Sequence, residues 1–406
     1  MVAMKKFPLH WQILVALILG ILFGAFLSDY TNYVDWMGDL FLRALKMIII
    51  PLIMSSIISG VANIGSAENL GRLGLKTLLY YVSTSTLAIL TGLFLVNLFQ
   101  PGVGADLGFS RNVEELGIMR QSFGQILINI IPTNIFEAFS QANMLSIIFF
   151  AILFGFFINL TGEKSRTFLT SFFDATFEVM MKITLFIIRF APFGVFGIVA
   201  YQVSQSESIM VLAQSMGLYM LTVFLGLLIH ACITLPLITR IIGRVNPLKH
   251  FRAVTTPLLT AFSTSSSSAT LPLTIQAVEN NCGVSNKISS FTLPLGATIN
   301  MDGTALYECV AAMFIAQAYG VELSVLQQAM VVVTALLASI GAAGIPMAGL
   351  VMISIILTAV GLPLEGLGLI LAVDRILDMF RTATNVWSDT CGAVVIARSE
   401  GEVLNV

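Results

Sequence analysis

Charge is scarce in this sequence. Asp, Glu, Lys and Arg make up 10% of its 406 residues, whereas 57% of the residues are hydrophobic and the mean hydropathy is +0.93. A soluble globular domain carries about 25% charged residues. The composition therefore excludes a soluble domain and indicates a polytopic membrane protein. At roughly 20 residues per spanning helix, the chain has room for about eight to ten spans joined by short loops.

Cysteine and histidine are also few. The four cysteines stand singly in apolar surroundings, without disulfide or zinc spacing, and we interpret them as small core residues. The three histidines (His10, His230 and His250) lie outside the polar clusters described below, so the serine-rich stretch has no nearby base. That absence, and the lack of a GxGD motif, argue against an intramembrane hydrolase. An ion channel is another alternative to a transporter. A measurement of uptake against a gradient would distinguish the two.

The first 243 residues contain a series of apolar runs that predict six helices. Lys5 and Lys6 precede the first run, which we interpret as an uncleaved span. Lys and Arg then recur in alternate loops, and the positive-inside bias places both termini in the cytoplasm. The predicted helices cover about 11–28, 36–62, 77–99, 122–160 (broken), 170–203 and 209–243.

Beyond residue 250 the pattern changes. The segments 254–285 and 328–363 have short apolar arms around "STSSSSATLP" and "SIGAAGIPMAG". Non-helical backbone at membrane depth is tolerated only where protein buries it or where it lines a cavity, so each segment predicts a re-entrant hairpin. A flexible linker and a helix-packing surface are the alternatives. Two more helices, about 287–318 and 366–398, are interrupted by polar residues.

The stretch "DRILDMFRTATNVWSD", residues 374–389, concentrates charge within the last of these helices. On a helix its six main polar residues share an arc of roughly 100°. A charge at mid-membrane costs about 2.5–3.5 kcal/mol on insertion scales, so this face must either pair internally or meet a polar ligand. An internal salt-bridge network is the plainer alternative. The residues on the arc are Asp374, Asp378, Arg381, Thr382, Asn385 and Asp389.

A second polar cluster is "TINMDGTALYE", residues 298–308. Asn300 and Asp302 beside Gly303 favour unwinding of the helix, which frees carbonyl oxygens next to a carboxylate. Hard cations prefer that set of ligands, although a simple kink would look the same. A third cluster, "YYVSTST" at 80–86, places Tyr81, Thr84 and Ser85 within a span, where hydroxyls often only bond to their own backbone.

Together, "SSSSATLP", "NMDGT", "SIGAAGIPMAG" and "DMFRTATNVWSD" make nearly the whole chain resemble the glutamate/aspartate transporters, the dicarboxylate/amino acid:cation symporters. The resemblance implies an all-α polytopic membrane protein, not an enzyme, with eight transmembrane helices, two re-entrant hairpins and inverted repeats. It implies a homotrimer in the cell membrane, namely the bacterial cytoplasmic membrane. This homotrimer would work by an elevator mechanism. The implied scaffold covers residues 1–76 and 122–208, and the implied transport domain covers 77–121, with its external loop, and 209–406.

The resemblance also implies an acidic amino acid, L-aspartate or L-glutamate, as substrate, driven by sodium. Arg381 would pair with the side-chain carboxylate of the substrate in a bidentate fashion. Asp378 would hold the ammonium group. Asp378 and Arg381 together argue against a dicarboxylate or neutral amino-acid carrier of the same fold. The other implied substrate residues are Thr382, Asn385, Thr304, Ser266, Ser267, Gly344, Ile345 and Gly349.

Three sodium sites follow from the same resemblance. Their residues are Asp389, Asn385, Asn300 and Gly296 in the first; Asp302, Thr84, Ser85, Tyr81 and Asn300 in the second; and Thr298, Met301, Ser339, Ile340 and Ala342 in the third. Nucleic acid is not an expected partner.

The sequence departs from the family at three positions. Ser265 and Met379 stand where archaeal and animal relatives, respectively, carry an arginine, and Ser388 replaces the glycine of "NVxGD". Glu308 stands where animal relatives have a glutamate, the proposed proton carrier, and archaeal relatives commonly have glutamine. Burial and neighbouring acids favour its protonated form, so we expect it to couple a proton to uptake, with K⁺ on the return step. A purely structural carboxylic acid is the alternative.

Overall fold

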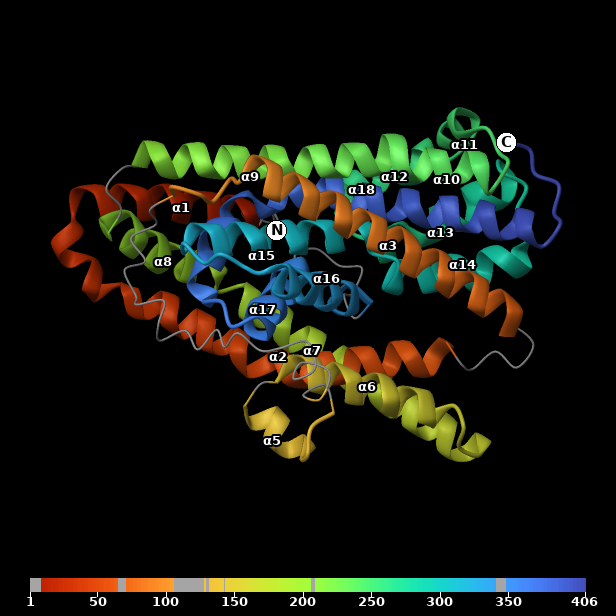
Figure 1. Cartoon of the computed structure of the whole chain (residues 1–406), viewed down its shortest axis with the longest axis horizontal. Coiled ribbons are helices and arrows are strands. Elements are labelled where there is room, and N and C mark those ends of the chain that lie inside the picture. The colour runs from red at the N-terminus through yellow and green to blue at the C-terminus, as the bar shows by residue number, and fades with distance from the viewer. Residues whose placement is uncertain are drawn as a thin grey trace, which may run out of the picture.

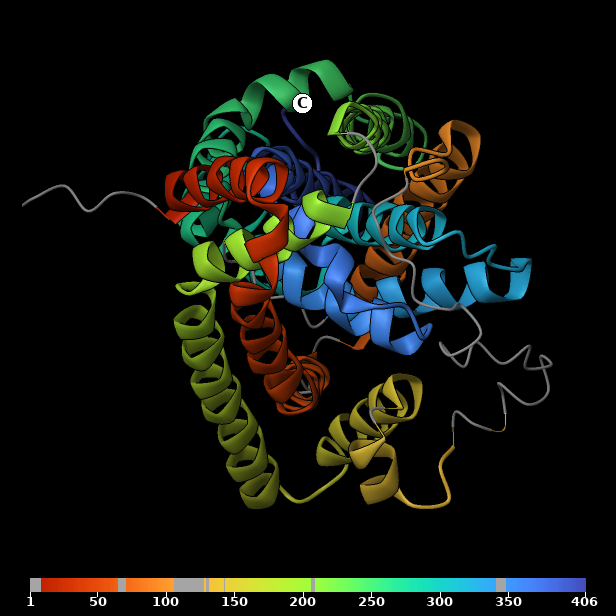
Figure 2. The same ribbon diagram turned by 90° about the vertical axis from the view of Figure 1, so that its left-hand side faces the viewer.

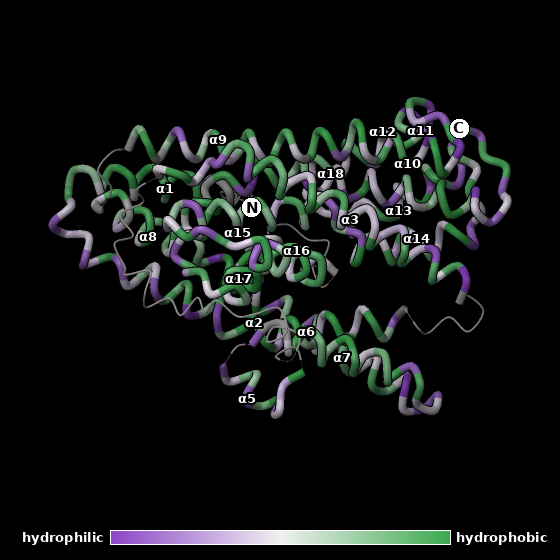
Figure 3. Tube along the Cα trace, viewed as in Figure 1, coloured by the Kyte–Doolittle hydropathy of each residue, from purple (hydrophilic) through white to green (hydrophobic). Residues whose placement is uncertain are grey.

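The computed structural model describes residues 9–64, 71–105, 128, 131–141, 143–205, 209–340 and 348–406. These residues form helices and their connections, without any strand, which confirms the predicted all-α class. Hydrophobic residues run along most of the helices, and hydrophilic ones gather at helix ends and in a few interior turns (Figure 3).

The first half of the chain has three long helices and several shorter ones. They are α1 (Leu9–Phe26), the 3₁₀ helix η1 (Ser28–Tyr33), α2 (Asp35–Ile64), α3 (Gly71–Phe99), α5 (Ile135–Ser140), α6 (Met144–Ile158), α7 (Glu163–Ile188) and α8 (Ala191–Gln205). The second half is more finely divided. It contains α9 (Ile209–Ile229), the π-helical turn η3 (His230–Thr234), α10 (Leu235–Ile241), α11 (Pro247–Ala253), α12 (Thr255–Thr264), α13 (Ser267–Asn280), α14 (Asn286–Ile299), α15 (Asp302–Ala318), α16 (Val325–Ile340), α17 (Ala348–Ala359), η4 (Leu364–Gly366) and α18 (Leu367–Ser399).

The helices pack in two groups. In one, α2 contacts α6, α7 and α8, and α1 lies along α8. In the other, α18 contacts α12, α14 and α15, while α3 packs against α15 and α9 (Figure 1). Viewed end-on, α6 and α7 project away from the compact group around α18 (Figure 2). The boundary between scaffold and transport domain stays a prediction.

The helix predicted at 170–203 is wrong as a single element. Two helices, α7 and α8, meet there at an angle of 52°. Pro192 lies in the first turn of α8, where it has no N–H to donate and its ring would clash with a carbonyl of the preceding turn. On length and composition, three described helices could cross a membrane, at Asp35–Asn63, Arg72–Phe99 and Ala213–Ile241, and the bent pair would make a fourth.

Both hairpin segments consist of short helices. The arms of the first, α12 and α13, have 10 and 14 residues, fewer than the roughly 20 that a full crossing needs. They meet at Ser265, whose φ of 51° is left-handed. The second pair, α16 and α17, has 16 and 12 residues, and its tip lies outside the described residues. The lengths agree with re-entrant hairpins, which remain a prediction.

The last seven residues fold back on the end of the helical bundle where α3 and α14 begin. Glu400 accepts hydrogen bonds from Arg72 at 2.5 Å and Lys76 at 2.6 Å, both at the start of α3. The Glu402 carboxylate accepts from the Ser285 N–H at 3.0 Å, and the Asn405 N–H donates to the Cys282 carbonyl at 2.9 Å. The C-terminal segment therefore ties α18 to both α3 and the base of the first hairpin.

Replacing Glu400 with glutamine tests this tie. Hydrogen bonds from Lys76 and then Arg72 hold the pKa of the Glu400 carboxyl below its usual value. A depressed folded-state pKa stabilises the fold above the unfolded value, and the gain is lost as pH falls through the folded value. Because Arg72 is largely exposed and Lys76 and Glu400 are partly exposed, solvent screens these ion pairs, and we expect E400Q to lower the unfolding free energy at pH 7 by about 0.5 kcal/mol. The difference from wild type should shrink as the pH falls below about 4.3, the ordinary pKa of glutamate.

Thermal unfolding in detergent at pH 7 and pH 3.5 measures this effect. E322Q, which changes an exposed glutamate just before α16, is the matched control. It should leave the unfolding temperature unchanged at both pH values. A deficit of E400Q that persists unchanged at pH 3.5 would contradict the assigned ion pairs.

Candidate functional site

The candidate site lies where the break between α14 and α15 packs against α18. The break at Asn300 and Met301 confirms that the polar residues interrupt this helix. A Cβ atom on Gly303 would lie 2.6 Å from the Arg381 carbonyl oxygen, so only glycine permits this close approach. Asn385 then joins the two segments: its Oδ1 accepts from the Gly303 N–H at 2.8 Å, and its Nδ2 donates to Thr304 Oγ1 at 3.1 Å.

Arg381 is buried in this packing, with 1% of its surface exposed. Its Nη2 donates to Asp378 Oδ1 at 2.6 Å and lies 3.3 Å from Asp374 Oδ1. Asp374 also accepts a hydrogen bond from the Tyr307 hydroxyl at 2.7 Å, and the guanidinium carbon lies 3.9 Å from the centre of the Tyr307 ring. The internal salt-bridge network, the alternative interpretation of this face, is therefore present, but its ion pairs use only Nη2 of the guanidinium.

Two nitrogens of Arg381 take no part in this network. Its Nε and Nη1 have no hydrogen-bond partner among the described residues. A Cβ atom on Gly349, at the start of α17, would lie 2.5 Å from Nη1, so the glycine lets the second hairpin approach the guanidinium closely. The N–H groups of Nε and Nη1 can donate to carboxylate oxygens, acceptors with which a guanidinium forms strong hydrogen bonds.

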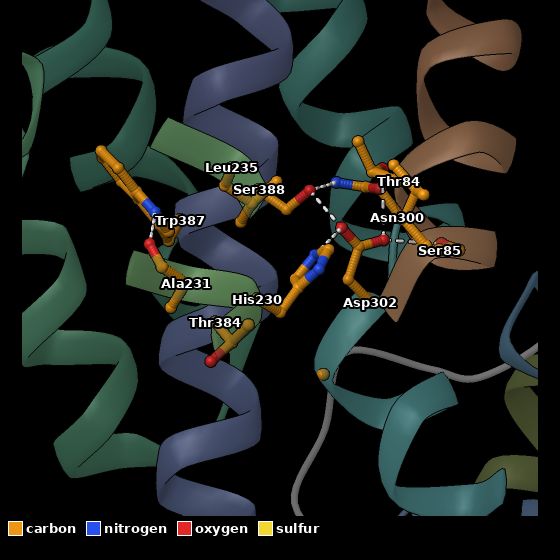
Figure 4. A network of polar contacts seen from close by, with 12 residues as sticks. Thr84, Ser85, His230, Ala231, Leu235, Asn300, Asp302, Thr384, Trp387 and Ser388 are labelled. Atoms are coloured by element: carbon orange, nitrogen blue, oxygen red, sulfur yellow. Dashed lines mark hydrogen bonds and ion pairs between the residues drawn. The ribbon is translucent and has the colours of Figure 1, made fainter. Parts of the chain in front are cut away.

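A second polar cluster surrounds Asp302, which is fully buried. Its Oδ1 accepts from Ser85 at 2.6 Å and lies 3.3 Å from Thr84 Oγ1, both on α3. Its Oδ2 accepts from Ser388 on α18 at 2.6 Å and lies 2.9 Å from His230 Nε2 (Figure 4). Four elements, α3, η3, α15 and α18, thus converge on one carboxylate.

Asn300 connects this cluster to Asp389. Its Nδ2 donates to Asp389 Oδ1 at 2.9 Å, and its Oδ1 lies 3.3 Å from Thr84 Oγ1. Gly296 is needed beside Asp389, because a Cβ atom there would be 2.4 Å from Asp389 Oδ1. The Tyr81 hydroxyl, next to the same glycine, donates to the Thr292 carbonyl at 2.7 Å.

Carboxylate, amide and hydroxyl oxygens are the ligands that hard cations prefer. The Asp302 cluster brings such oxygens together within the apolar bundle, where two buried aspartates need a counter-charge. The residues present therefore fit a monovalent cation such as Na⁺, bound as a transported ion. Asp302, Thr84, Ser85 and Asn300 are the residues that would hold it.

Several predicted site residues make hydrogen bonds close to their own position in the chain. The hydroxyls of Thr298 and Ser339 donate to carbonyls of their own helices, and Ser266 accepts from the Ala269 N–H at the start of α13. Ser267 begins α13, Ile340 is the last residue of α16, and Thr382 is buried on α18. Gly344, Ile345 and Ala342 lie outside the described residues.

Met301 directly precedes α15, and Glu308 lies in the second turn of that helix. The Met301 sulfur is 3.7 Å from Asn385 Nδ2. Glu308 is fully buried, and neither of its carboxyl oxygens has a hydrogen-bond partner among the described residues. A buried carboxyl without hydrogen bonds is costly in its charged form.

The prediction that all three histidines lie outside the polar clusters is wrong for His230. The π-helical turn at His230–Thr234 inserts an extra residue into the helix and aims the ring at Asp302, a register that a 3.6-residue period does not give. Such π-bulges often occur at functional sites. An ionisable residue inside an apolar run was itself a signal of function.

Known proteins are similar to this chain over nearly its whole length. Residues 9–399 match the sodium:dicarboxylate symporter family. The chain is 37% identical to the proton/sodium-glutamate symport protein of Geobacillus stearothermophilus, over 98% of this chain and 96% of that protein. It is equally identical to the proton/glutamate-aspartate symporter of Escherichia coli K12 (97% and 93%) and to excitatory amino acid transporter 3 of Oryctolagus cuniculus (96% and 85%). The chain belongs to the sodium:dicarboxylate symporter family.

Proposed function

We propose that this membrane protein is a secondary active symporter that takes up L-aspartate and L-glutamate, driven by sodium. The observation that carries the proposal is the buried Arg381, whose Nε and Nη1 lack partners among the described residues while its Nη2 pairs with Asp378. Relatives at 37% identity are named for glutamate and aspartate symport.

The charges of the site favour an amino acid with two carboxylates. Its side-chain carboxylate would pair with the unpartnered N–H groups of Arg381, and its ammonium group would pair with Asp378. A dicarboxylate without an ammonium would bring uncompensated negative charge next to Asp374 and Asp378. A neutral amino acid would leave those N–H groups of Arg381 unpaired, which is costly in a buried site. Thr382, Asn385 and Thr304 would contact the rest of the substrate.

The hairpins would close around this substrate. Ser266 and Ser267 would contribute from the first hairpin tip, and Gly344, Ile345 and Gly349 from the second. The remaining cations would be held by Asp389, Asn385, Asn300 and the Gly296 carbonyl in one site, and by carbonyls of Thr298, Met301, Ser339, Ile340 and Ala342 in another. Tyr81 would complete the Asp302 site.

Movement of the group around α18 against the α2 group would carry the substrate across the membrane. The contacts that each group makes within itself support such an elevator. The proposal includes a homotrimer of eight-helix protomers with two re-entrant hairpins, and both termini in the cytoplasm.

The test is uptake of labelled L-aspartate by the purified protein in liposomes, with Na⁺, H⁺ and K⁺ gradients imposed one at a time. Accumulation should require an inward Na⁺ gradient and should be competed by glutamate, but not by succinate or alanine. Competition by succinate would indicate a dicarboxylate carrier, and flux that never exceeds equilibrium would indicate a channel.

Replacing Glu308 with glutamine tests proton coupling. The buried Glu308 carboxyl would bind a proton with the substrate and release it on the cytoplasmic side, and its deprotonated form would accompany K⁺ on return. We therefore expect E308Q to keep aspartate exchange within about threefold of wild type while net uptake no longer changes with pH. An intramembrane acid of this kind is a functional candidate on physical grounds.

Exchange and net uptake are measured in the same liposomes between pH 6 and pH 8. E365Q, a change in the short η4 helix, serves as the control and should keep the wild-type pH profile. If E308Q also keeps that profile, Glu308 is a structural residue.

A further inference from the structure

The side chain of Ser388 bridges two residues of the Asp302 cluster. Ser388 is fully buried on α18. Its Oγ lies 3.0 Å from Asn300 Nδ2, from which it accepts a hydrogen bond, and 2.6 Å from Asp302 Oδ2, to which it donates (Figure 4). A hydroxyl has a single proton, so accepting from the amide commits that proton to the carboxylate.

These contacts fix the orientation of the Asn300 amide. Its Nδ2 lies 2.9 Å from Asp389 Oδ1, and an ionised carboxylate can only accept. The NH₂ group therefore faces Asp389 and Ser388, and the amide oxygen faces α3. There, Asn300 Oδ1 and Asp302 Oδ1 each lie 3.3 Å from Thr84 Oγ1, so the two acceptor oxygens converge on one side.

We infer that Ser388 is a positioning residue for the sodium site at Asp302, an inference that rests on the proposed function. It holds the far sides of Asn300 and Asp302, so that one oxygen of each faces the hydroxyls of Thr84 and Ser85. Holding ligands in place before the ion arrives removes an ordering cost from binding. Ser388 thereby sets the affinity of this site for Na⁺ without ligating the ion.

Neither neighbouring contact can replace this bridge. Asp389 is itself in a proposed cation site, so a cation there competes for the oxygen that holds Asn300. His230 reaches Asp302 Oδ2 at 2.9 Å and, in the described structure, makes no contact with Asn300. Glycine, which "NVxGD" relatives carry at this position, has no hydroxyl to supply.

The experiment compares S388A with T384V in the full-length protein, purified in detergent without substrate. Thr384 is a suitable control because it is on the same helix and, among the described residues, its hydroxyl donates to the Phe380 carbonyl at 2.9 Å. The quantity measured is the Kd for Na⁺, fitted from the rise in Tm with ln(1 + [Na⁺]/Kd). We expect S388A to raise it by about ten- to a hundredfold, as for one lost hydrogen bond to a charged group, and T384V to leave it within about twofold.

A second readout separates positioning from general damage. Because Arg381 and Asp378 are untouched, aspartate Kd in S388A should return to within about threefold of wild type once Na⁺ is saturating. S388G is a second variant with the same expectation, should S388A not fold.

An unchanged or lowered Kd for Na⁺ in the folded S388A variant overturns the role of Ser388. An equal rise of that Kd in T384V overturns it as well. Those results leave the proposed function intact if wild-type Tm responds to Na⁺. A wild-type protein whose Tm ignores Na⁺ overturns both.

Discussion

Replacing Arg381 with cysteine is expected to abolish binding of L-aspartate and L-glutamate. The substrate carboxylate would lose its cationic partner within the bundle. Asp374 and Asp378 would lose their ion pairs with Arg381, and Asp378 would keep the 3.8 Å contact with Arg375. Removing one half of a buried charge pair costs roughly 2–5 kcal/mol, which corresponds to a roughly 30- to 5,000-fold weaker Kd. We also expect small neutral amino acids to bind, because the smaller side chain frees space next to Gly349.

Binding is measured by isothermal titration in saturating Na⁺, with alanine and serine as test ligands. R398C removes a positive charge from the far end of the same helix and should bind aspartate like wild type. The Na⁺-dependent rise in Tm shows whether R381C is folded, since the Asp302 cluster does not involve Arg381. Aspartate binding within a few-fold of wild type would refute the role of Arg381.

Replacing Asp302 with asparagine should weaken the Na⁺-dependent stabilisation of the protein. The change deletes the buried charge on which Ser85, Thr84, Ser388 and His230 converge. A ligand present at 100 times its Kd stabilises a protein by about 2.7 kcal/mol, and the part of the stabilisation that comes from this site should be lost. Coupling between ligands is reciprocal, so the apparent aspartate affinity should fall with it. D389N should act in the same direction.

Tm and aspartate Kd are each measured across a range of Na⁺ concentrations. D174N is the control: Asp174 accepts hydrogen bonds from Ser59 and Asn63 in the α2 group, far along the chain from the proposed sites. It should keep the Na⁺ dependence of wild type. If wild-type aspartate affinity proves independent of Na⁺, the coupling ion is not sodium and the assigned roles fail.

Composition and hydrophobic patterning were sufficient to predict the helical class and the break near Asn300. Both follow from local chemistry: apolar runs need helical hydrogen bonding in a bilayer, and Asn, Asp and Gly together end a membrane helix. The bend between α7 and α8 is also local, because Pro192 ends one helix, but a continuous apolar run concealed it. The predicted face of α18 was informative for the same reason, since 100° per residue placed Asp374, Asp378 and Arg381 together.

Contacts between distant segments could not be predicted in this way. His230 meets Asp302 because a π-turn shifts its register, and no helical period includes that extra residue. Ser388 looked like a disturbance of backbone geometry next to Asp389. In the structure the helix continues through it, and the hydroxyl reaches Asn300 and Asp302, a contact that depends on how α14, α15 and α18 pack.

The way the Asp302 cluster is assembled has a consequence for biosynthesis. Thr84 and Ser85 lie in α3, whereas Ser388 and Asp389 lie near the end of the chain. Asp302 leaves the ribosome roughly 90 residues before Ser388, which at about 5–20 residues per second is on the order of 5–20 s. For that interval the nascent chain holds a carboxylate that lacks its partner on α18, Ser388, although Thr84, Ser85 and His230 have already been made. Truncated chains that stop before α18 should therefore be recognised as unfinished and degraded, even though most of their helices are complete.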